Sequence, residues 1–154
     1  MKGLNHLKPE VRLSITNPES DSHSEYGRGI AQLCLGVRET GSLNAAAKRL
    51  GMAYSKAWRI IKETEAALDV QLLNRNGAHG STLTEEGDAL LDSYLKLAED
   101  MSGEADRRYQ ELLAQEAEAA AAEGEADADE AKVEIDGVTY TLHDVDVEGA
   151  GDEQ

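Results

Sequence analysis

A cluster of hydrogen-bond donors lies between residues 48 and 62, in a chain that is otherwise strongly acidic. The guanidinium of Arg59 can donate two parallel hydrogen bonds to the acceptor edge of a guanine. The ammonium and hydroxyl groups around it can bind base edges or phosphate oxygens. These groups belong to Lys48, Arg49, Tyr54, Ser55, Lys56 and Lys62. Side chains of these types, held on one surface, favour contact with duplex DNA.

No other residues have the spacing of a catalytic or metal site. The 4 histidines are scattered, and none belongs to a His-x-x-x-His pair that could hold zinc. No serine or cysteine lies in a nucleophile motif, and no glycine-rich phosphate loop follows a strand pattern. Cys34 is the single cysteine and has leucine on both sides, so we expect a buried, unreactive thiol. We therefore expect no enzyme activity, no metal and no cofactor.

The charge is divided unevenly along the 154 residues, whose net charge is -16. Residues 1–83 contain 11 Lys and Arg against 8 Asp and Glu, a net charge of +3, whereas residues 84–154 contain 4 against 23, a net charge of -19. The first half is thus free to bind an anion although the whole chain is acidic. The sequence has neither a membrane-spanning apolar run nor the apolar core of a signal peptide, so we expect a cytoplasmic protein.

Three short helices are expected to position the basic cluster. Apolar residues repeat at helical spacing over residues 28–40, and Gly41 ends that helix. Ser42 caps a second helix that runs to about residue 50. Gly51 provides the turn into a third helix over residues 54–68. The buried stripe of this third helix is formed by Ala57, Ile61, Thr64 and Leu68.

A β-hairpin is predicted next, because strand-like residues 71–75 and 81–84 flank a glycine-containing loop. Arg75 and His79 lie on this hairpin, and each could contact DNA. The alternative for Arg75 is an ion pair within the protein, and the alternative for His79 is exposure to solvent without a partner. Trp58 either packs under the hairpin or turns its edge to DNA, and packing is favoured. Two helices joined by a glycine turn and followed by such a wing are typical of a helix-turn-helix that places its last helix in the major groove.

The rest of the chain divides by composition. A short strand is expected at residues 11–15 within an N-terminal segment, 1–25. After the winged domain, 26–84, a long helix is expected over 85–115, with an apolar stripe formed by Leu90, Tyr94, Leu97 and Met101. Residues 116–131 are an acidic, alanine-rich linker that either frays as helix or is disordered. Asp136-Gly137 predicts a β-hairpin over 132–148 that needs a partner surface, and 149–154 are a disordered tail. The fold class is therefore mainly α with a small β component.

Residues 26–97 resemble the winged helix-turn-helix domain of LysR-type transcriptional regulators, and within that group the ModE-like, molybdate-responsive regulators. The matching stretches are residues 40–43, 45–52, 54–58, 68–75 and 80–87. The resemblance implies a homodimer that pairs through the long helix, at Leu90, Tyr94, Leu97 and Met101, and binds an inverted-repeat operator. Ala53 stands where the family usually has a Ser or Thr cap, which should cost about 1 kcal/mol of helix stability. No molybdate-binding module is present, so a molybdate response is not expected.

Two functions fit these observations. The first is a transcriptional regulator that binds double-stranded DNA as a homodimer. Its expected DNA contacts are Ser42, Lys48, Arg49, Tyr54, Ser55, Lys56, Arg59, Lys62, Arg75 and His79. The second is a protein-interaction module in which the winged domain and the acidic tail bind a protein partner. In a variant of the first, the acidic tail competes with DNA for the basic face of its own domain.

Overall fold

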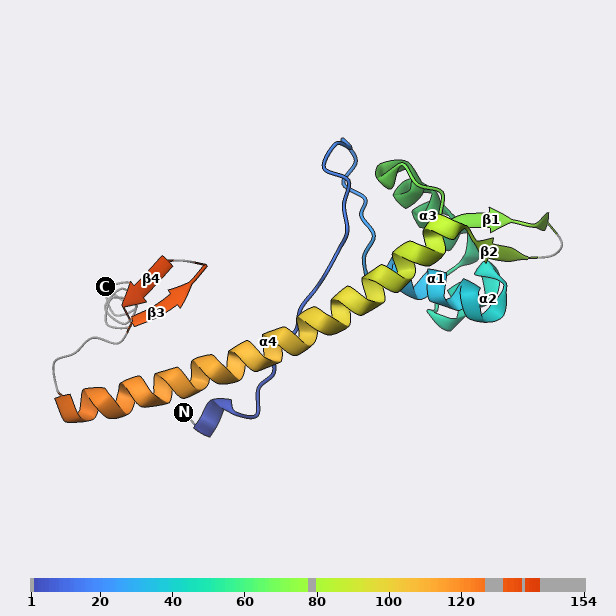
Figure 1. The fold of residues 1–154 in the computed structure, drawn as a ribbon. Coiled ribbons are helices and arrows are strands. Elements are labelled where there is room, and N and C mark those ends of the chain that lie inside the picture. The colour runs from blue at the N-terminus through green and yellow to red at the C-terminus, as the bar shows by residue number, and fades with distance from the viewer. Residues whose placement is uncertain (1, 78–79, 127–131, 137, 142–154) are drawn as a thin grey trace, which may run out of the picture. The chain divides into compact units, whose positions relative to one another are not determined.

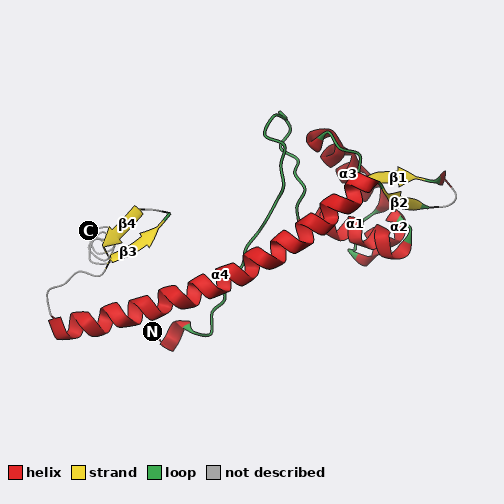
Figure 2. Ribbon diagram, viewed as in Figure 1, coloured by secondary structure: helices red, strands yellow, loops and turns green. Residues whose placement is uncertain are grey.

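The computed structural model describes residues 2–77, 80–126, 132–136 and 138–141. The chain forms two compact units, residues 10–103 and residues 1–9 together with 104–154. The first unit holds α1 (Arg28–Thr40), α2 (Leu43–Arg49), α3 (Tyr54–Leu68) and the antiparallel strands β1 (Leu73–Arg75) and β2 (Ser81–Leu83). It also includes residues 85–103 of α4 (Glu85–Ala126). The three short helices gather beside the β1–β2 hairpin and the start of α4 (Figure 1). This arrangement confirms the predicted fold class, as the colouring by secondary structure also shows (Figure 2).

The ends of the short helices are set by the residues that the sequence indicated. Gly41 has a left-handed backbone, with φ of 73°, and its N–H donates to the carbonyl of Val37 at 2.7 Å. The hydroxyl of Ser42 accepts the N–H of Ala45 at 3.1 Å and caps α2. Ala53 gives α3 no side-chain cap. The predicted end of α1 at Gly41, the cap of α2 at Ser42 and the missing cap of α3 at Ala53 are thus confirmed.

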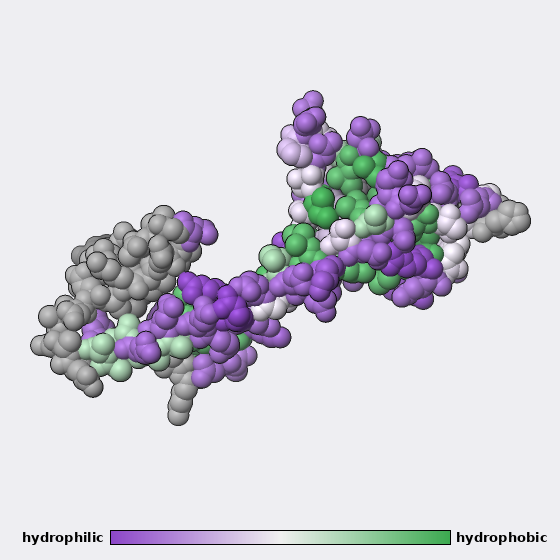
Figure 3. All heavy atoms as spheres, in the orientation of Figure 1, coloured by the Kyte–Doolittle hydropathy of each residue, from purple (hydrophilic) through white to green (hydrophobic). Residues whose placement is uncertain are grey.

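The core of the first unit is almost entirely aliphatic. Its largest fully buried side chains include those of Leu33, Leu43, Ile61, Leu72 and Leu91. One aromatic pair joins them, since the rings of Tyr26 and Tyr94 lie with centroids 5.5 Å apart. Hydrophobic side chains are visible at the surface of this unit among hydrophilic ones (Figure 3). An aliphatic core of this kind holds α1, α3 and α4 together chiefly by burial of apolar surface.

The strand expected at residues 11–15 is not formed. Residues 11–14 pair with no strand in the described part of the chain, and Ile15 makes a single β-bridge to Tyr26, with both N–H···O distances 2.9 Å. The alternating pattern has another cause. Leu13 and Ile15 pack against the core, and the hydroxyl of Tyr94 donates to the carbonyl of Leu13 at 3.1 Å. The segment is extended because it packs on helices, not because it belongs to a sheet.

The apolar stripe predicted on α4 is divided between two environments. Tyr94 is only 6% exposed and belongs to the core of its own chain, and Leu90 packs against that core. Leu97 and Met101 are each 40% exposed. Tyr94, which was expected to contact a second subunit, is therefore buried within its own chain.

The second unit contains the short 3-10 helix η1 (Lys2–Leu4), the rest of α4 and the antiparallel strands β3 (Lys132–Ile135) and β4 (Val138–Thr141). The hydroxyl of Tyr109 donates to the carbonyl of Leu4 at 3.0 Å, and Lys8 pairs with Asp106 at 3.2 Å. These contacts hold the N-terminal segment on α4. The backbone of β3 and β4 forms the predicted hairpin as far as Thr141, and residues 142–148 of that prediction lie outside the described residues.

The helix α4 runs to Ala126, beyond the predicted end at residue 115. Alanine and glutamate are strong helix formers, which favours helix over disorder in residues 116–126. Residues 127–131 of the expected linker and the expected tail, 149–154, lie outside the described residues. Within the described ranges no helix combines the length and the apolar character needed to cross a bilayer.

Cys34 is fully buried, as predicted, and burial raises the pKa of its thiol to about 11. The ordinary value is about 8.5, so above that pH the unfolded chain loses the thiol proton while the folded chain keeps it. We expect the free energy of unfolding to fall between pH 8.5 and 11, and to fall less steeply in Cys34→Ala. We also expect iodoacetamide to label the thiol only after unfolding in denaturant. Rapid labelling of the native protein at neutral pH would contradict this assignment.

Candidate nucleic-acid interface

The helix α3 presents three faces with different surroundings. Its core face is buried and includes Ala57, Ile61 and Thr64. Its outer face carries Ser55, Lys56 and Arg59, which are all exposed. Its third face, which meets the wing, is marked by Tyr54, Trp58 and Lys62 at intervals of four residues. The outer face therefore offers its polar groups to a ligand while the other two faces hold the helix in place.

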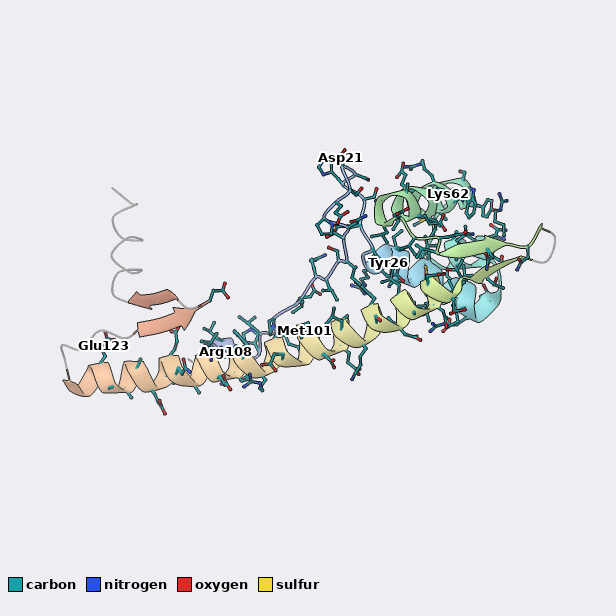
Figure 4. The ribbon with its side chains drawn as sticks, turned by 45° about the horizontal axis from the view of Figure 1, so that its top comes forward. Asp21, Tyr26, Lys62, Met101, Arg108 and Glu123 are labelled. Carbon is teal, nitrogen blue, oxygen red and sulfur yellow. The ribbon has the colours of Figure 1, made fainter. Side chains whose placement is uncertain are left out.

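The surface around α3 is basic for a reason visible in the sequence. Residues 40–62 contain five cations and no carboxylate, a net charge of +5. The cations are Lys48, Arg49, Lys56, Arg59 and Lys62, and Figure 4 shows Lys62 on α3. Carboxylates lie only at the edges of this stretch.

Three of these cations pair with carboxylates at those edges. Arg49 pairs with Glu39 at 2.6 Å, and Arg59 pairs with Glu63 at 3.6 Å while remaining 60% exposed. Lys62 lies 3.5 Å from Glu65. Exposed pairs of this kind are worth at most about 1 kcal/mol, so Arg49 and Arg59 can exchange them for another anion. Among the described residues, Lys48 and Lys56 form no ion pair.

The wing is attached to α3 through the single tryptophan. Trp58 is half-buried, and the guanidinium of Arg75 lies 4.6 Å from the centre of its ring. The ammonium of Lys62 lies 4.9 Å from the same centre. Arg75 also donates to the hydroxyl of Tyr54 at 3.1 Å. Trp58 thus packs under the wing, which was the favoured alternative. His79, the other predicted contact on the wing, lies outside the described residues.

The start of β2 rests on the turn between α1 and α2. The N–H of Ser81 donates to the carbonyl of Gly41 at 2.9 Å. Gly80 has φ of 93°, and a Cβ atom there would lie 2.2 Å from that same carbonyl oxygen. Only glycine allows this approach. A pocket of about 250 Å³ lies between the wing and the starts of α2 and α3, and its lining includes Ser42, Tyr54 and Arg75.

Glu65 is a structural residue of this interface that sequence reasoning missed. Its side chain is 9% exposed, and Oε2 accepts the N–H groups of Leu72 at 2.7 Å and Leu73 at 3.1 Å. The carboxylate therefore ties the last turn of α3 to the beginning of the wing. Glu65 follows Ile61 by four residues on the buried side of the helix, and a carboxylate at such a position was the available signal.

The start of α4 is fixed by Thr84 and by an arginine from α1. The hydroxyl of Thr84 accepts the N–H of Gly87 at 2.8 Å and donates to the carbonyl of Gln71 at 2.5 Å. Arg38 pairs with Asp88 at 2.5 Å and with Asp92 at 2.9 Å. The hydrogen bond to Asp88 is the main reason that the pKa of Arg38 is raised. The wing is thereby held between α3 on one side and the first turns of α4 on the other.

Residues 31–88 match the family model of the bacterial regulatory helix-turn-helix proteins of the lysR family. The matched range contains α2, α3 and both strands of the wing. By this domain the chain belongs to the lysR family of bacterial regulatory proteins. The match confirms the LysR-type part of the resemblance, while the ModE-like part is not shown. This family model describes the DNA-binding domain of regulators and does not describe a class of enzymes.

Solved structures of LysR-type proteins are similar to between 51% and 60% of the chain. The DNA complex of the CbnR DNA-binding domain is 32% identical, with a TM-score of 0.46, over 53% of this chain and 93% of that one. CbnR itself, a LysR family transcriptional regulator, is 33% identical over 51% of this chain and 27% of its own, with a TM-score of 0.43. VV2_1132, another LysR family transcriptional regulator, is 27% identical over 60% of this chain and 28% of its own chain, with a TM-score of 0.37. The chain thus spans about a quarter of the two regulators. No curated protein matches the sequence.

Proposed function

We propose that this protein is a transcription regulator that reads double-stranded DNA by placing α3 in the major groove. The outer face of α3 carries the proposal, because it exposes Ser55, Lys56 and Arg59 within a stretch of net charge +5. Major-groove readout needs such a helix with polar side chains at its first turns. A bacterial regulator of chromosomal genes acts in the cytoplasm, where its DNA lies.

Within this proposal the side chains have different tasks. Arg59 reads a base, because a guanidinium can bind the O6 and N7 atoms of a guanine together. Ser55 and Lys56 contact bases or phosphates beside it. The phosphate backbone is contacted by Lys48 and Arg49 on α2 and by Ser42 just before it. These contacts supply affinity without sequence information.

A second copy of the chain is proposed to bind along α4. Leu97 and Met101 are exposed apolar residues on this helix, and Leu90, which packs partly against the core of its own chain, lies about two turns before Leu97 on the same side. Met101 can be followed on α4 in Figure 4. Covering these side chains with a symmetric partner removes apolar surface from water. A two-fold dimer would place two copies of α3 on DNA, and its operator would be an inverted repeat.

Selection from a random duplex library tests the proposal and returns the operator. The full chain is mixed with the library at low salt, and bound DNA is recovered and sequenced over several rounds. We expect enrichment of a motif with two inverted half-sites. An enriched motif without symmetry would contradict the homodimer but not the DNA reading. The absence of any enriched motif would contradict the regulator and favour the protein-interaction module.

A further inference from the structure

The last cross-strand pair of the wing is held from both sides. Arg75 and Ser81 are partners in the β1–β2 register, and the loop at the tip of the wing lies between them. Ser81 is bonded through its N–H to the carbonyl of Gly41, in the turn before α2. Arg75 is held by the side chains of α3. This end of the two strands is therefore linked to α3 through Arg75 and to the turn before α2 through Ser81.

Arg75 makes two contacts of different kinds with α3. Its guanidinium lies over the ring of Trp58, and it donates a hydrogen bond to the hydroxyl of Tyr54. The ring restricts the plane of the guanidinium, and the hydroxyl restricts its rotation within that plane. Tyr54 and Trp58 are one helical turn apart on α3, so both contacts act on the same face of that helix. We call these three residues the Arg75 clamp.

We infer that Arg75 is a positioning residue, which sets the distance between the Arg75–Ser81 end of the β1–β2 hairpin and the outer face of α3 through the Arg75 clamp. This role differs both from the DNA contact and from the internal ion pair that the sequence left open for Arg75. It rests on the proposed function, because the distance matters only if wing and helix engage one duplex together. A wing that moves relative to α3 weakens binding even when every cation is still present.

The test compares three variants of the full chain: Arg75→Lys, Arg75→Gln and Tyr54→Phe. Arg75→Lys keeps the charge but loses the planar group that stacks and donates in a fixed direction. Tyr54→Phe removes only the hydroxyl. For the duplex recovered by selection, we expect each of these two changes to weaken binding by roughly two- to fivefold, the value of one exposed cation–π or hydrogen-bond contact. We expect the double variant to be no weaker than Arg75→Lys alone, since both changes break one unit.

A readout in the free protein separates this inference from the proposed function. Trp58 is the only tryptophan of the chain, so its emission reports the clamp without DNA. We expect Arg75→Gln to shift the emission to longer wavelength and to increase quenching by acrylamide. Lys48→Gln is the matched control, because it removes a cation from the same surface but touches no residue of the clamp. It should weaken binding and leave the emission unchanged.

The inference is overturned if Arg75→Lys and Tyr54→Phe bind as the wild type does, or if Arg75→Gln leaves Trp58 emission unchanged. Additive effects of the two changes would also overturn it, because they would assign both side chains to separate DNA contacts. Failure of the wild type to bind any duplex would contradict the proposed function instead, and the emission of Trp58 would still decide whether Arg75 holds the wing.

Discussion

Replacing Glu65 with alanine is expected to lower the free energy of unfolding by about 3 kcal/mol, because it leaves two buried N–H groups without an acceptor. These are the N–H groups of Leu72 and Leu73, which both donate to Oε2 of Glu65. Both leucines are buried, so water cannot replace the lost acceptor without opening the core. Chemical denaturation followed by circular dichroism measures the change.

Two further variants make this prediction specific. Glu65→Gln keeps one carbonyl oxygen at the same place, so we expect a smaller loss. Glu63→Ala removes an exposed carboxylate from the same helix and is expected to change stability by no more than about 0.5 kcal/mol. If Glu65→Ala were as mild as Glu63→Ala, the attachment of the wing through Glu65 would be wrong.

Replacing Arg59 with alanine is expected to relax base preference at one position of each half-site. A bidentate contact to guanine is worth about 1–3 kcal/mol of discrimination, which is roughly 5- to 150-fold between the best and the second base. Arg59 is free to make that contact because its only described ion pair, with Glu63, is exposed and long at 3.6 Å. Binding of wild type and variant to single-base variants of the selected duplex measures the effect.

Lys48→Ala is the matched control for Arg59→Ala. Lys48 is exposed on α2 and is expected to contact a phosphate. Its loss should therefore weaken binding to all sequences alike, and it should reduce the slope of log K against log salt by the contribution of about one phosphate contact. If Arg59→Ala also weakened binding to all sequences by the same factor, Arg59 would be a phosphate ligand. The residue that reads the base would then be Ser55 or Lys56.

The parts of the fold that could be predicted from sequence are those fixed by local rules. Apolar periodicity and the caps at Gly41 and Ser42 determined the bounds of α1, α2 and α3, because both signals act within a few residues. The wing followed from two short strands around glycines. These elements place the basic side chains of α2 and α3, so the location of the candidate interface was also predictable.

The errors arose where contacts distant in sequence decide the outcome. The alternation of Val11, Leu13 and Ile15 indicated a strand, but packing on helices produces the same spacing when no neighbouring strand is present. Tyr94 shared a stripe with Leu97 and Met101, yet the position of Tyr26 decides that only Tyr94 is buried within the chain. Glu65 was missed for a different reason, because its partners lie only seven and eight residues later, beyond the end of α3, and the helical pattern does not show that the chain folds back onto that helix.

The salt dependence of binding tests the central claim most directly. The affinity of the full wild-type chain for the selected duplex is measured by fluorescence anisotropy from about 50 to 200 mM salt. Because at least four cations face the proposed DNA, log K should fall linearly with log salt, with a slope of about -3 or steeper. No binding at the lowest salt, or an affinity that does not change with salt, would contradict the account of α3 and its surroundings as a DNA-binding surface.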